Sequence, residues 1–344
     1  MAGRVCVVDA GGTIAQVRAG ADLSYEKEVQ PLGFLTEADR KVLEGLGVAD
    51  AVHLFAKDST VITPADWSLI GRTITERFDH FDGFVVTHGT DSLVYTASIL
   101  SWMLGPIAKP VVVTGAQIPM RDQAAHGRTD AWANLVSSVL VAGQARIREV
   151  AVVFGSRILR GNRATKIRVV ELDAIESPNL RELGRIGKDV VYDPAYTPPR
   201  FALDGPSIPA RWPRVLVVKA VPGLDPELVR AALAQGFDGC ALETFSSGSI
   251  PPELLAVAER SGIPWLLCMP GYTGISDAFY YEPTYWLERG MIVSGRDMTR
   301  EAAYCKLMWT LADGRDHEAA VALMKQDLAG EMQATARPVH AAGP

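Results

Sequence analysis

The 344-residue sequence has few cysteines and no long apolar run. The four cysteines, Cys6, Cys240, Cys268 and Cys305, are far apart, lie among apolar residues and form no CxxC pair. Buried reduced thiols are therefore expected, and neither disulfides nor a zinc site. No apolar run approaches the roughly 20 residues that a membrane-spanning helix needs, so a membrane is not an expected partner.

Basic charge and a targeting segment are also lacking. The formal net charge is −6, because 34 Lys and Arg face 40 Asp and Glu. Without a basic surplus to neutralise phosphates, nucleic acid is not an expected partner. The N-terminus runs directly into a strand-like segment and lacks the basic region, apolar core and cleavage site of a signal peptide. We therefore expect a cytoplasmic protein.

Histidines at metal-ligand spacing are absent as well. The sequence has six histidines, and five of them, His53, His80, His126, His317 and His340, show no ligand spacing. The sixth, His88, lies within a polar motif, where structural hydrogen bonding is its expected role. No metal site is predicted.

Short apolar runs alternate with helical patterns along the chain. The strand-like runs lie at residues 4–9, 83–87, 110–114, 150–154, 215–219, 240–242 and 265–268. Several are apolar throughout, as expected for strands that are covered on both faces. Helices are predicted to begin near Thr63-Pro64, Ser92, Asp130, Asp225-Pro226 and Thr299. This alternation predicts a parallel, three-layer α/β sheet.

The length predicts two domains, at roughly 100–200 residues per domain. The fold class predicted is α/β, with a larger N-terminal three-layer parallel-sheet domain at 1–193 and a smaller C-terminal α/β domain at 215–331. Between them, residues 194–214 are rich in proline and predict an extended linker. Residues 332–344 are small and polar and predict a disordered tail. A β-hairpin is predicted around Gly161-Asn162.

The first polar cluster follows the run that ends at Asp9. Gly11 and Gly12 precede Thr13 and would let the backbone approach a ligand closely. Ligands of open α/β sheets bind beyond the carboxyl ends of the strands, where Thr13 is expected to lie. A plain strand–turn is an alternative. A dinucleotide loop would need a GxGxxG pattern, but positions 14 and 15 carry no glycine.

The second cluster is His88-Gly89-Thr90-Asp91, which follows a strand-like run and opens a helical pattern. Thr90 and Asp91 would lie near the helix N-terminus, where unpaired N–H groups and the dipole favour an anionic group. Either residue could instead cap the helix, but capping does not explain the four residues together. A third motif ends in Lys166, which is an ordinary surface charge unless it meets Asp91.

Taken together, these motifs resemble the bacterial-type L-asparaginases, especially their cytoplasmic type I branch. The matching motifs are Gly-Gly-Thr-Ile-Ala at 11–15, His-Gly-Thr-Asp at 88–91, Val-Thr-Gly-Ala-Gln-Ile-Pro at 113–119 and Arg-Gly-Asn-Arg-x-Thr-Lys at 160–166. The resemblance covers about residues 4–330. It implies hydrolysis of L-asparagine to L-aspartate and ammonia, without a metal or organic cofactor, in a homodimer or homotetramer.

The resemblance also implies catalytic roles. Thr13 would be the nucleophile that forms an acyl-enzyme, and Tyr25 would assist it. Thr90, Asp91 and Lys166 would form the second catalytic group. A lysine there relays protons only if burial lowers its pKa toward working pH. Backbone N–H groups of the glycine turns are expected to stabilise the oxyanion, by roughly 3–4 kcal/mol.

Further residues are implied to bind the small-molecule amide substrate. Ser59 would hold the α-carboxylate, and Asp91 would also hold the α-ammonium. Other substrate contacts are implied at Gly12, Thr60, Gly89, Ala116 and Ser249.

Some positions depart from the family pattern. Ala10 and Ser92 differ from the usual motif residues, but neither change removes a reacting group. In a loop that reaches a neighbouring protomer's site in the family, Ser246 replaces a glycine and Ser249 an asparagine. Glu243 stands where some type I enzymes have an arginine linked to allosteric control. We expect these changes to bear on which amide is recognised, and on regulation, more than on amide hydrolysis itself.

Three other functions therefore stay open. The first is the same chemistry on another primary amide, such as a biosynthetic intermediate. The second is the ammonia-supplying subunit of an archaeal-type transamidosome, although that subunit has an additional N-terminal domain, for which we expect no room before Gly11. The third is a non-catalytic binding module, which the presence of all the reacting side chains disfavours.

Overall fold

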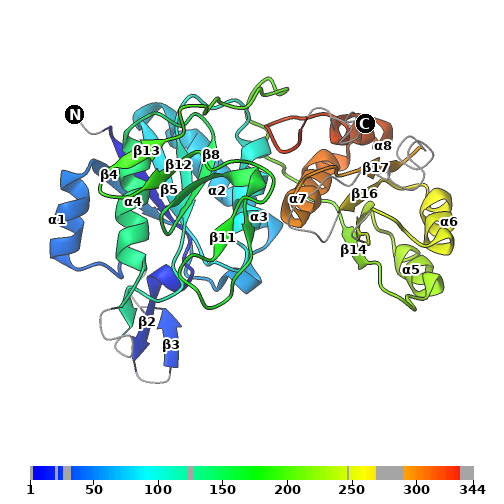
Figure 1. Cartoon of the computed structure of the whole chain (residues 1–344), viewed down its shortest axis with the longest axis horizontal. Coiled ribbons are helices and arrows are strands. Elements are labelled where there is room, and N and C mark those ends of the chain that lie inside the picture. Colours follow the sequence, from blue (N-terminus) through cyan, green and yellow to red (C-terminus); the bar gives the residue numbers. More distant parts are fainter. Residues whose placement is uncertain are drawn as a thin grey trace, which may run out of the picture. The chain divides into compact units, whose positions relative to one another are not determined.

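The computed structural model describes residues 3–19, 22–25, 32–122, 128–245, 248–268 and 290–333 (Figure 1). The chain forms two compact units. The first contains residues 1–199 and 203–208, and the second contains residues 200–202 and 209–344. The proline-rich residues 194–214 form neither helix nor strand, and they contribute short pieces to both units.

An eight-stranded sheet lies at the centre of the N-terminal unit, in the order β13-β12-β9-β8-β6-β5-β1-β4. Five neighbouring strands are parallel, namely β4 (Val48–His53), β1 (Val5–Asp9), β5 (Gly83–Thr87), β6 (Val111–Thr114) and β8 (Val150–Phe154). Three antiparallel strands extend it, namely β9 (Arg157–Arg160), β12 (Gly184–Ile186) and β13 (Val190–Tyr192). The predicted parallel sheet is confirmed for its central strands.

Helices cover both faces of this sheet (Figure 1). α2 (Pro64–Arg77) and α3 (Leu93–Met103) pack on one face, and α1 (Glu37–Gly45) and α4 (Ala131–Gly143) on the other. β1, β5 and β8 are buried along their whole length, because their alternate side chains enter two different cores. The continuous apolar runs of the sequence are thereby explained.

Local sequence accounts for the start of α2. Thr63 and Asp66 form a capping box, in which the Thr63 N–H donates to Asp66 Oδ2 at 2.8 Å, and Pro64 occupies the first helical position. This helix start was predicted from the same residues and is confirmed. Burial of one face, which includes Trp67, Ile70 and Ile74, then holds the helix against the sheet.

The hairpin predicted around Gly161-Asn162 is wrong. Residues 161–163 form a short 3-10 turn, and β10 (Thr165–Lys166) pairs with β11 (Ile175–Glu176) instead. The hairpin lies earlier in the chain, where Gly155-Ser156 joins β8 to β9 and Gly155 has a φ of 59°. Two-residue hairpin turns need positive φ, so the glycine that sets the turn is Gly155.

The C-terminal unit is a four-stranded parallel sheet with helices. Its strands are β14 (Val215–Lys219), β15 (Gly239–Glu243), β16 (Trp265–Cys268) and β17 (Ile292–Ser294), in that order. Its helices are α5 (Pro226–Leu233), α6 (Pro252–Ser261), α7 (Arg300–Thr310) and α8 (His317–Met324).

The four cysteines of the chain are buried and unbridged, as predicted, and burial raises the pKa of Cys6 and Cys268 to about 12.

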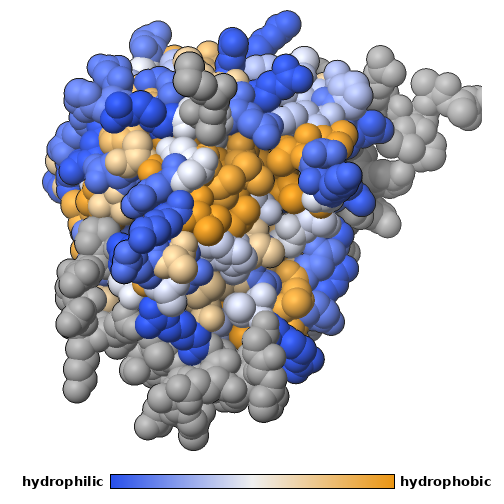
Figure 2. Space-filling view, turned by 90° about the vertical axis from the view of Figure 1, so that its left-hand side faces the viewer, coloured by the Kyte–Doolittle hydropathy of each residue, from blue (hydrophilic) through white to orange (hydrophobic). Residues whose placement is uncertain are grey.

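The surface carries one feature relevant to partners. On the face that Figure 2 shows, hydrophobic residues form a contiguous area that is framed by hydrophilic ones. Areas of this kind are typical of contacts with another macromolecule. Among the described residues, no helix combines the length and apolar character needed to cross a bilayer.

The end of the described chain is anchored by a buried ion pair. Lys306 Nζ on α7 lies 2.6 Å from Glu331 Oε1, and both side chains are completely buried. Glu331 also accepts the N–H of Ala329 at 2.7 Å. Burial lowers the pKa of Lys306. Met332 is buried too, so ordered packing extends to that residue of the predicted tail; residues 334–344 lie outside the described part.

We expect Glu331→Gln to destabilise the protein by about 3–5 kcal/mol, because it removes the carboxylate that contacts the buried Lys306 ammonium. Glutamine keeps an oxygen to accept the backbone N–H groups, so the loss reports on the charge. Denaturant unfolding followed by tryptophan fluorescence measures it. The matched control is Glu227→Gln, which breaks an exposed pair with Arg230 and should change little. Equal stability of both variants would contradict the expectation.

Candidate active site

Three chain turns meet at the carboxyl edge of the parallel strands. After β1, Gly11 and Gly12 adopt φ values of 74° and 81°. A Cβ on Gly12 would lie 2.0 Å from the backbone nitrogen of Gly89, and a Cβ on Gly89 would lie 2.6 Å from Ser59 Oγ. Only glycine fits at such distances. The turns that carry Thr13, Thr90 and Ser59 are therefore in direct contact.

Thr13 begins a short 3-10 turn, Thr13–Ala15, that follows the two glycines. Its neighbours Ile14 and Ala15 are buried, whereas Thr13 itself is partly exposed. The chain then forms a hairpin of β2 (Gln16–Ala19) and β3 (Asp22–Tyr25), which pairs the Tyr25 backbone with that of Gln16. The Tyr25 side chain lies outside the described part, so its assistance to Thr13 stays a prediction.

Thr90, Asp91 and Lys166 come together from distant segments. Lys166 Nζ donates to Thr90 Oγ1 at 2.9 Å and pairs with Asp91 Oδ1 at 2.7 Å. The Lys166 side chain is 15% exposed, and that of Asp91 is 61% exposed. The cation is thus enclosed, while the carboxylate faces solvent, where it can meet a ligand. Lys166 therefore meets Asp91, as a functional role for this lysine requires.

Helix capping does not explain this cluster. The N-cap residue of α3 is Ser92, and no side chain caps the helix there. Ser92 Oγ instead donates to the carbonyl oxygen of Ser59 at 2.6 Å. The side chains of Thr90 and Asp91 point to Lys166 rather than to the helix backbone.

The segment that positions Lys166 is well anchored. The 3-10 turn Gly161–Arg163 packs along α3, and a Cβ on Gly161 would lie 3.0 Å from the carbonyl oxygen of Ala97. At the start of the segment, Arg160 Nε pairs with the buried Glu149 at 2.6 Å. This anchoring fixes the lysine on β10, which lies outside the eight-stranded sheet that contains β5.

One site residue was not assigned a role from the sequence. Gln117 Oε1 accepts from Thr90 Oγ1 at 3.2 Å, and its Nε2 donates to the carbonyl oxygen of Val169 at 2.8 Å. It therefore orients the Thr90 hydroxyl and ties it to the loop after Lys166. The available signal was its place in the Val-Thr-Gly-Ala-Gln motif that follows a strand.

The residues implied for substrate binding have different surroundings. Ser59 is buried, and its Oγ accepts from the Asp91 N–H at 3.3 Å, so the two lie next to each other. Thr60 is exposed and donates its hydroxyl to Asp58 at 2.6 Å. Ala116 is completely buried, and its methyl group packs in the core. Ser249 belongs to the C-terminal unit and is exposed; Ser246 lies outside the described part.

The prediction that backbone N–H groups of the glycine turns stabilise the oxyanion is wrong for Gly11 and Gly12. The Gly11 N–H donates to Asp9 Oδ1 at 3.2 Å, and the Gly12 N–H donates to the carbonyl oxygen of Lys57 at 3.0 Å. Both groups are thus used to shape the turn. These hydrogen bonds explain how the turn holds its positive φ values. They also make both N–H groups unavailable to an oxyanion.

His88 has the structural role that was expected. Its Nδ1 lies 2.9 Å from the carbonyl oxygen of Gly89, and its Nε2 lies 2.9 Å from Thr96 Oγ1. Trp67 Nε1 donates to the same hydroxyl at 3.0 Å, so the Thr96 proton points to Nε2. Burial lowers the pKa of His88 to about 4. The ring is therefore neutral, with its proton on Nδ1, and fixes the Gly89 turn.

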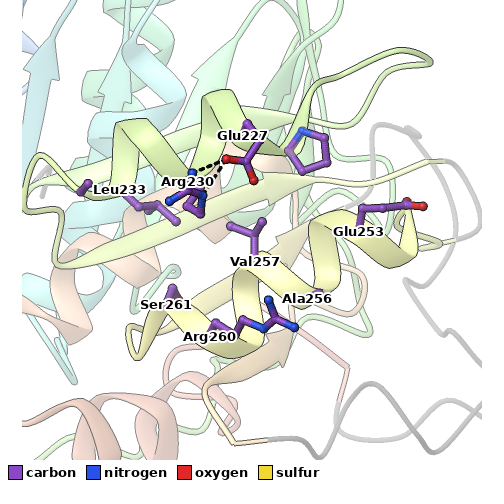
Figure 3. A pocket seen from close by; sticks show the side chains of 10 residues that line it. Glu227, Arg230, Leu233, Glu253, Ala256, Val257, Arg260 and Ser261 are labelled. Carbon is purple, nitrogen blue, oxygen red and sulfur yellow. Dashed lines mark hydrogen bonds and ion pairs between the residues drawn. The ribbon is translucent and has the colours of Figure 1, made fainter.

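Neither a metal cluster nor the described cavity competes with this site. Among the described residues, no group of three or more His, Cys, Asp or Glu side chains could hold a metal ion. A cavity of about 570 Å³ lies between α5 and α6 in the C-terminal unit. Arg230 and Glu227 form an ion pair on its wall, and no residue implied for catalysis lines it (Figure 3).

The neutral His88 predicts a pH dependence of stability. Its pKa is lower when folded than the ordinary 6.5, so the folded state binds fewer protons than the unfolded chain. The stabilisation is present above pH 6.5 and is lost as the pH falls toward 4. We expect about 2 kcal/mol to be lost by pH 5. Unfolding at pH 7.5 and pH 5 should show this loss in wild type and in exposed His80→Gln, but a smaller one in His88→Asn.

Comparisons with known proteins match most of the chain. Residues 4–197 match the family model "Asparaginase, N-terminal", and residues 214–324 match "Glutaminase/Asparaginase C-terminal domain". The chain is 34% identical over 340 residues to an L-asparaginase of Thermococcus kodakarensis, covering 96% of this chain and 99% of that protein. It is 36% identical over 285 residues to L-asparaginase 1 of Escherichia coli K12, covering 80% and 82%.

Two further similarities point the same way. The thermostable L-asparaginase structure from Thermococcus kodakarensis superposes with a TM-score of 0.83 at 30% identity, covering 96% of this chain and 100% of that one. A glutamyl-tRNA(Gln) amidotransferase subunit of Aeropyrum pernix is 32% identical over 350 residues, covering 96% and 79%. The chain therefore belongs to the asparaginase family, and it is an amidohydrolase of the asparaginase type.

Proposed function

We propose that the chain hydrolyses L-asparagine to L-aspartate and ammonia, with Thr13 as the nucleophile. The observation that carries this proposal is the hydrogen-bonded group of Lys166, Thr90 and Asp91. Thr90 and Asp91 lie on a turn that touches the Thr13 turn. Relatives that match nearly the full chain are named L-asparaginases, which supports the choice of substrate.

The chemistry proceeds in two halves. Thr13 Oγ1 attacks the side-chain amide carbon, its proton is transferred to the leaving nitrogen, and the C–N bond breaks to give ammonia and a threonyl ester. Water then attacks the ester carbon, and aspartate leaves as the proton returns to Thr13. Thr90 orients this water, since its hydroxyl lies between Lys166 Nζ and Gln117 Oε1.

Asp91 and Ser59 bind the α-ammonium and α-carboxylate groups of the substrate. One Asp91 oxygen is held by Lys166, and the exposed carboxylate is free to take the substrate ammonium through the other. Ser59 Oγ accepts from the Asp91 N–H and so keeps its own proton to donate to the substrate carboxylate. Charges of both signs are thus bound on neighbouring turns, as an α-amino acid requires.

We expect Thr13→Val, Thr90→Val and Lys166→Met each to lower kcat for L-asparagine by at least about 1000-fold, because each removes a reacting group while keeping its volume. Ammonia release measures the rates. The matched controls are Thr197→Val and Lys188→Met, which alter exposed residues of the same types and should keep wild-type activity. Full activity of Thr13→Val would exclude it as the nucleophile.

A second candidate is the same reaction on another primary amide, and Ser249 favours it. This serine is exposed, and its side chain is shorter than the family asparagine and lacks the amide. Assay of a panel of primary amides with wild type and Ser249→Asn separates the two. Turnover of another amide but not of L-asparagine would make the second candidate correct, and we would then expect Ser249→Asn to shift activity toward L-asparagine.

The similarity to the tRNA-dependent amidotransferase keeps a third possibility testable. Here the chain would supply ammonia to a partner rather than release it. Purification with tRNA and a second protein in constant ratio would favour this role. Cytoplasmic location and a homodimer or homotetramer stay predictions, which fractionation and light scattering measure.

A further inference from the structure

A single buried carboxylate lies beneath the three turns. Asp9 Oδ1 accepts from Thr87 Oγ1 at 2.8 Å and from the Gly11 N–H at 3.2 Å. Asp9 Oδ2 lies 2.9 Å from His53 Nδ1. The carboxylate is nearly inaccessible to solvent, and so it has no path to a substrate of its own.

Strand register explains how these groups meet. Asp9 is the last residue of β1 and lies opposite His53, the last residue of β4, and Thr87, the last residue of β5. Residues paired in neighbouring parallel strands point to the same face of the sheet. The three side chains therefore form a row across the carboxyl edge.

Each strand in this row leads into one part of the site. β1 continues to Thr13, and β5 continues to Thr90. β4 continues through residues 55–57, which border Gly11, to Ser59. A Cβ on Gly11 would meet the Lys57 nitrogen at 2.8 Å, so this border is tight. Asp9 thus touches all three segments at the points where they leave the sheet.

The charge of Asp9 strengthens these contacts. Hydrogen bonds to an ionised acceptor are roughly twice as strong as neutral ones. The hydrogen bond to Asp9 raises the pKa of His53. His53 Nε2 has no hydrogen-bond partner within the described residues, so among them its ring is oriented through Nδ1 alone. Removal of Asp9 would release the imidazole as well as the Gly11 turn.

We propose that Asp9, with His53 and Thr87, is a positioning residue that holds the Thr13 turn in register with the Ser59 and Thr90 turns. This inference rests on the proposed function. Asp9 acts through the Gly11 N–H and contacts neither the substrate nor the reacting atoms. Its side chain couples the nucleophile to two strands at once.

The contacts predict which kinetic constant depends on Asp9. Ser59 and Asp91 are joined directly, by the Asp91 N–H to Ser59 Oγ and by Ser92 Oγ to the Ser59 carbonyl oxygen. The residues proposed to bind the substrate are therefore held together by hydrogen bonds that do not involve Asp9. The Thr13 turn depends on Asp9 at Gly11 and on Lys57 at Gly12. Displacing a reacting group by about 1 Å can lower a rate by 100-fold.

We expect Asp9→Ala to lower kcat by about 100-fold while KM changes less than about threefold. Asp9→Asn should recover much of the rate, because an amide oxygen can still accept from Thr87 and the Gly11 N–H. The matched control is Asp50→Ala, an exposed aspartate on β4, which should retain wild-type kcat.

A double-mutant cycle tests the coupling. Thr87→Val should lower kcat in wild type and have little further effect in Asp9→Ala, because its partner is already missing. Should Asp9→Ala fail to fold, Thr87→Val, which keeps the side-chain volume, tests the coupling by itself: it should lower kcat and leave KM nearly unchanged. A loss of thermal stability with unchanged kcat, or a loss expressed only in KM, would overturn the inference.

Failure of the proposed function gives a different pattern. If wild type hydrolyses none of the amides, the proposed function fails, and amide hydrogen exchange of peptides spanning residues 7–15 then decides the inference. Faster exchange there in Asp9→Ala than in Asp50→Ala supports positioning of the turn by Asp9. Equal exchange in the two variants overturns it.

Discussion

The missing Cβ at Gly12 allows the turn after β1 to lie against the backbone of Gly89, at a distance that any other residue would forbid. Gly89 in turn lies against Ser59, so three loops that leave three different strands form one continuous surface. Parallel strands make this possible, because their carboxyl ends share an edge. The placement of Thr13 beside Thr90 and Ser59 depends on this contact.

Buried polar groups hold that surface from below. Asp9 ties the ends of β4, β1 and β5 together, while the neutral His88 ring fixes the carbonyl oxygen of Gly89 through a chain that includes Thr96 and Trp67. Hydrogen-bonded networks of this kind rigidify a site, which suits a surface whose reacting groups come from separate segments.

Much of this could be predicted from the sequence. The apolar runs indicated the central strands, because strands covered on both faces need no polar alternation, and the Thr63-Pro64-x-Asp66 pattern indicated the start of α2. The cluster of Thr90 and Lys166 was expected from the family resemblance that the motifs carry. Four features were not: the use of Gly155 for the hairpin, the consumption of the Gly11 and Gly12 N–H groups, the role of Gln117, and the row of Asp9, His53 and Thr87. Apart from the hairpin turn, these features depend largely on contacts between distant segments, and periodicity does not contain that information.

The distance along the chain between Thr13 and Lys166 has a consequence for synthesis. Thr13 leaves the ribosome about 150 residues before the lysine, which at 5–20 residues per second is on the order of 10–30 s. Contacts of such high sequence separation form late in folding. The segment that carries Lys166 packs along α3 through residues 161–163, so a nascent chain contains Thr13 long before the proposed catalytic group is complete. Synthesis therefore separates the proposed nucleophile from the proposed lysine until most of the N-terminal unit exists.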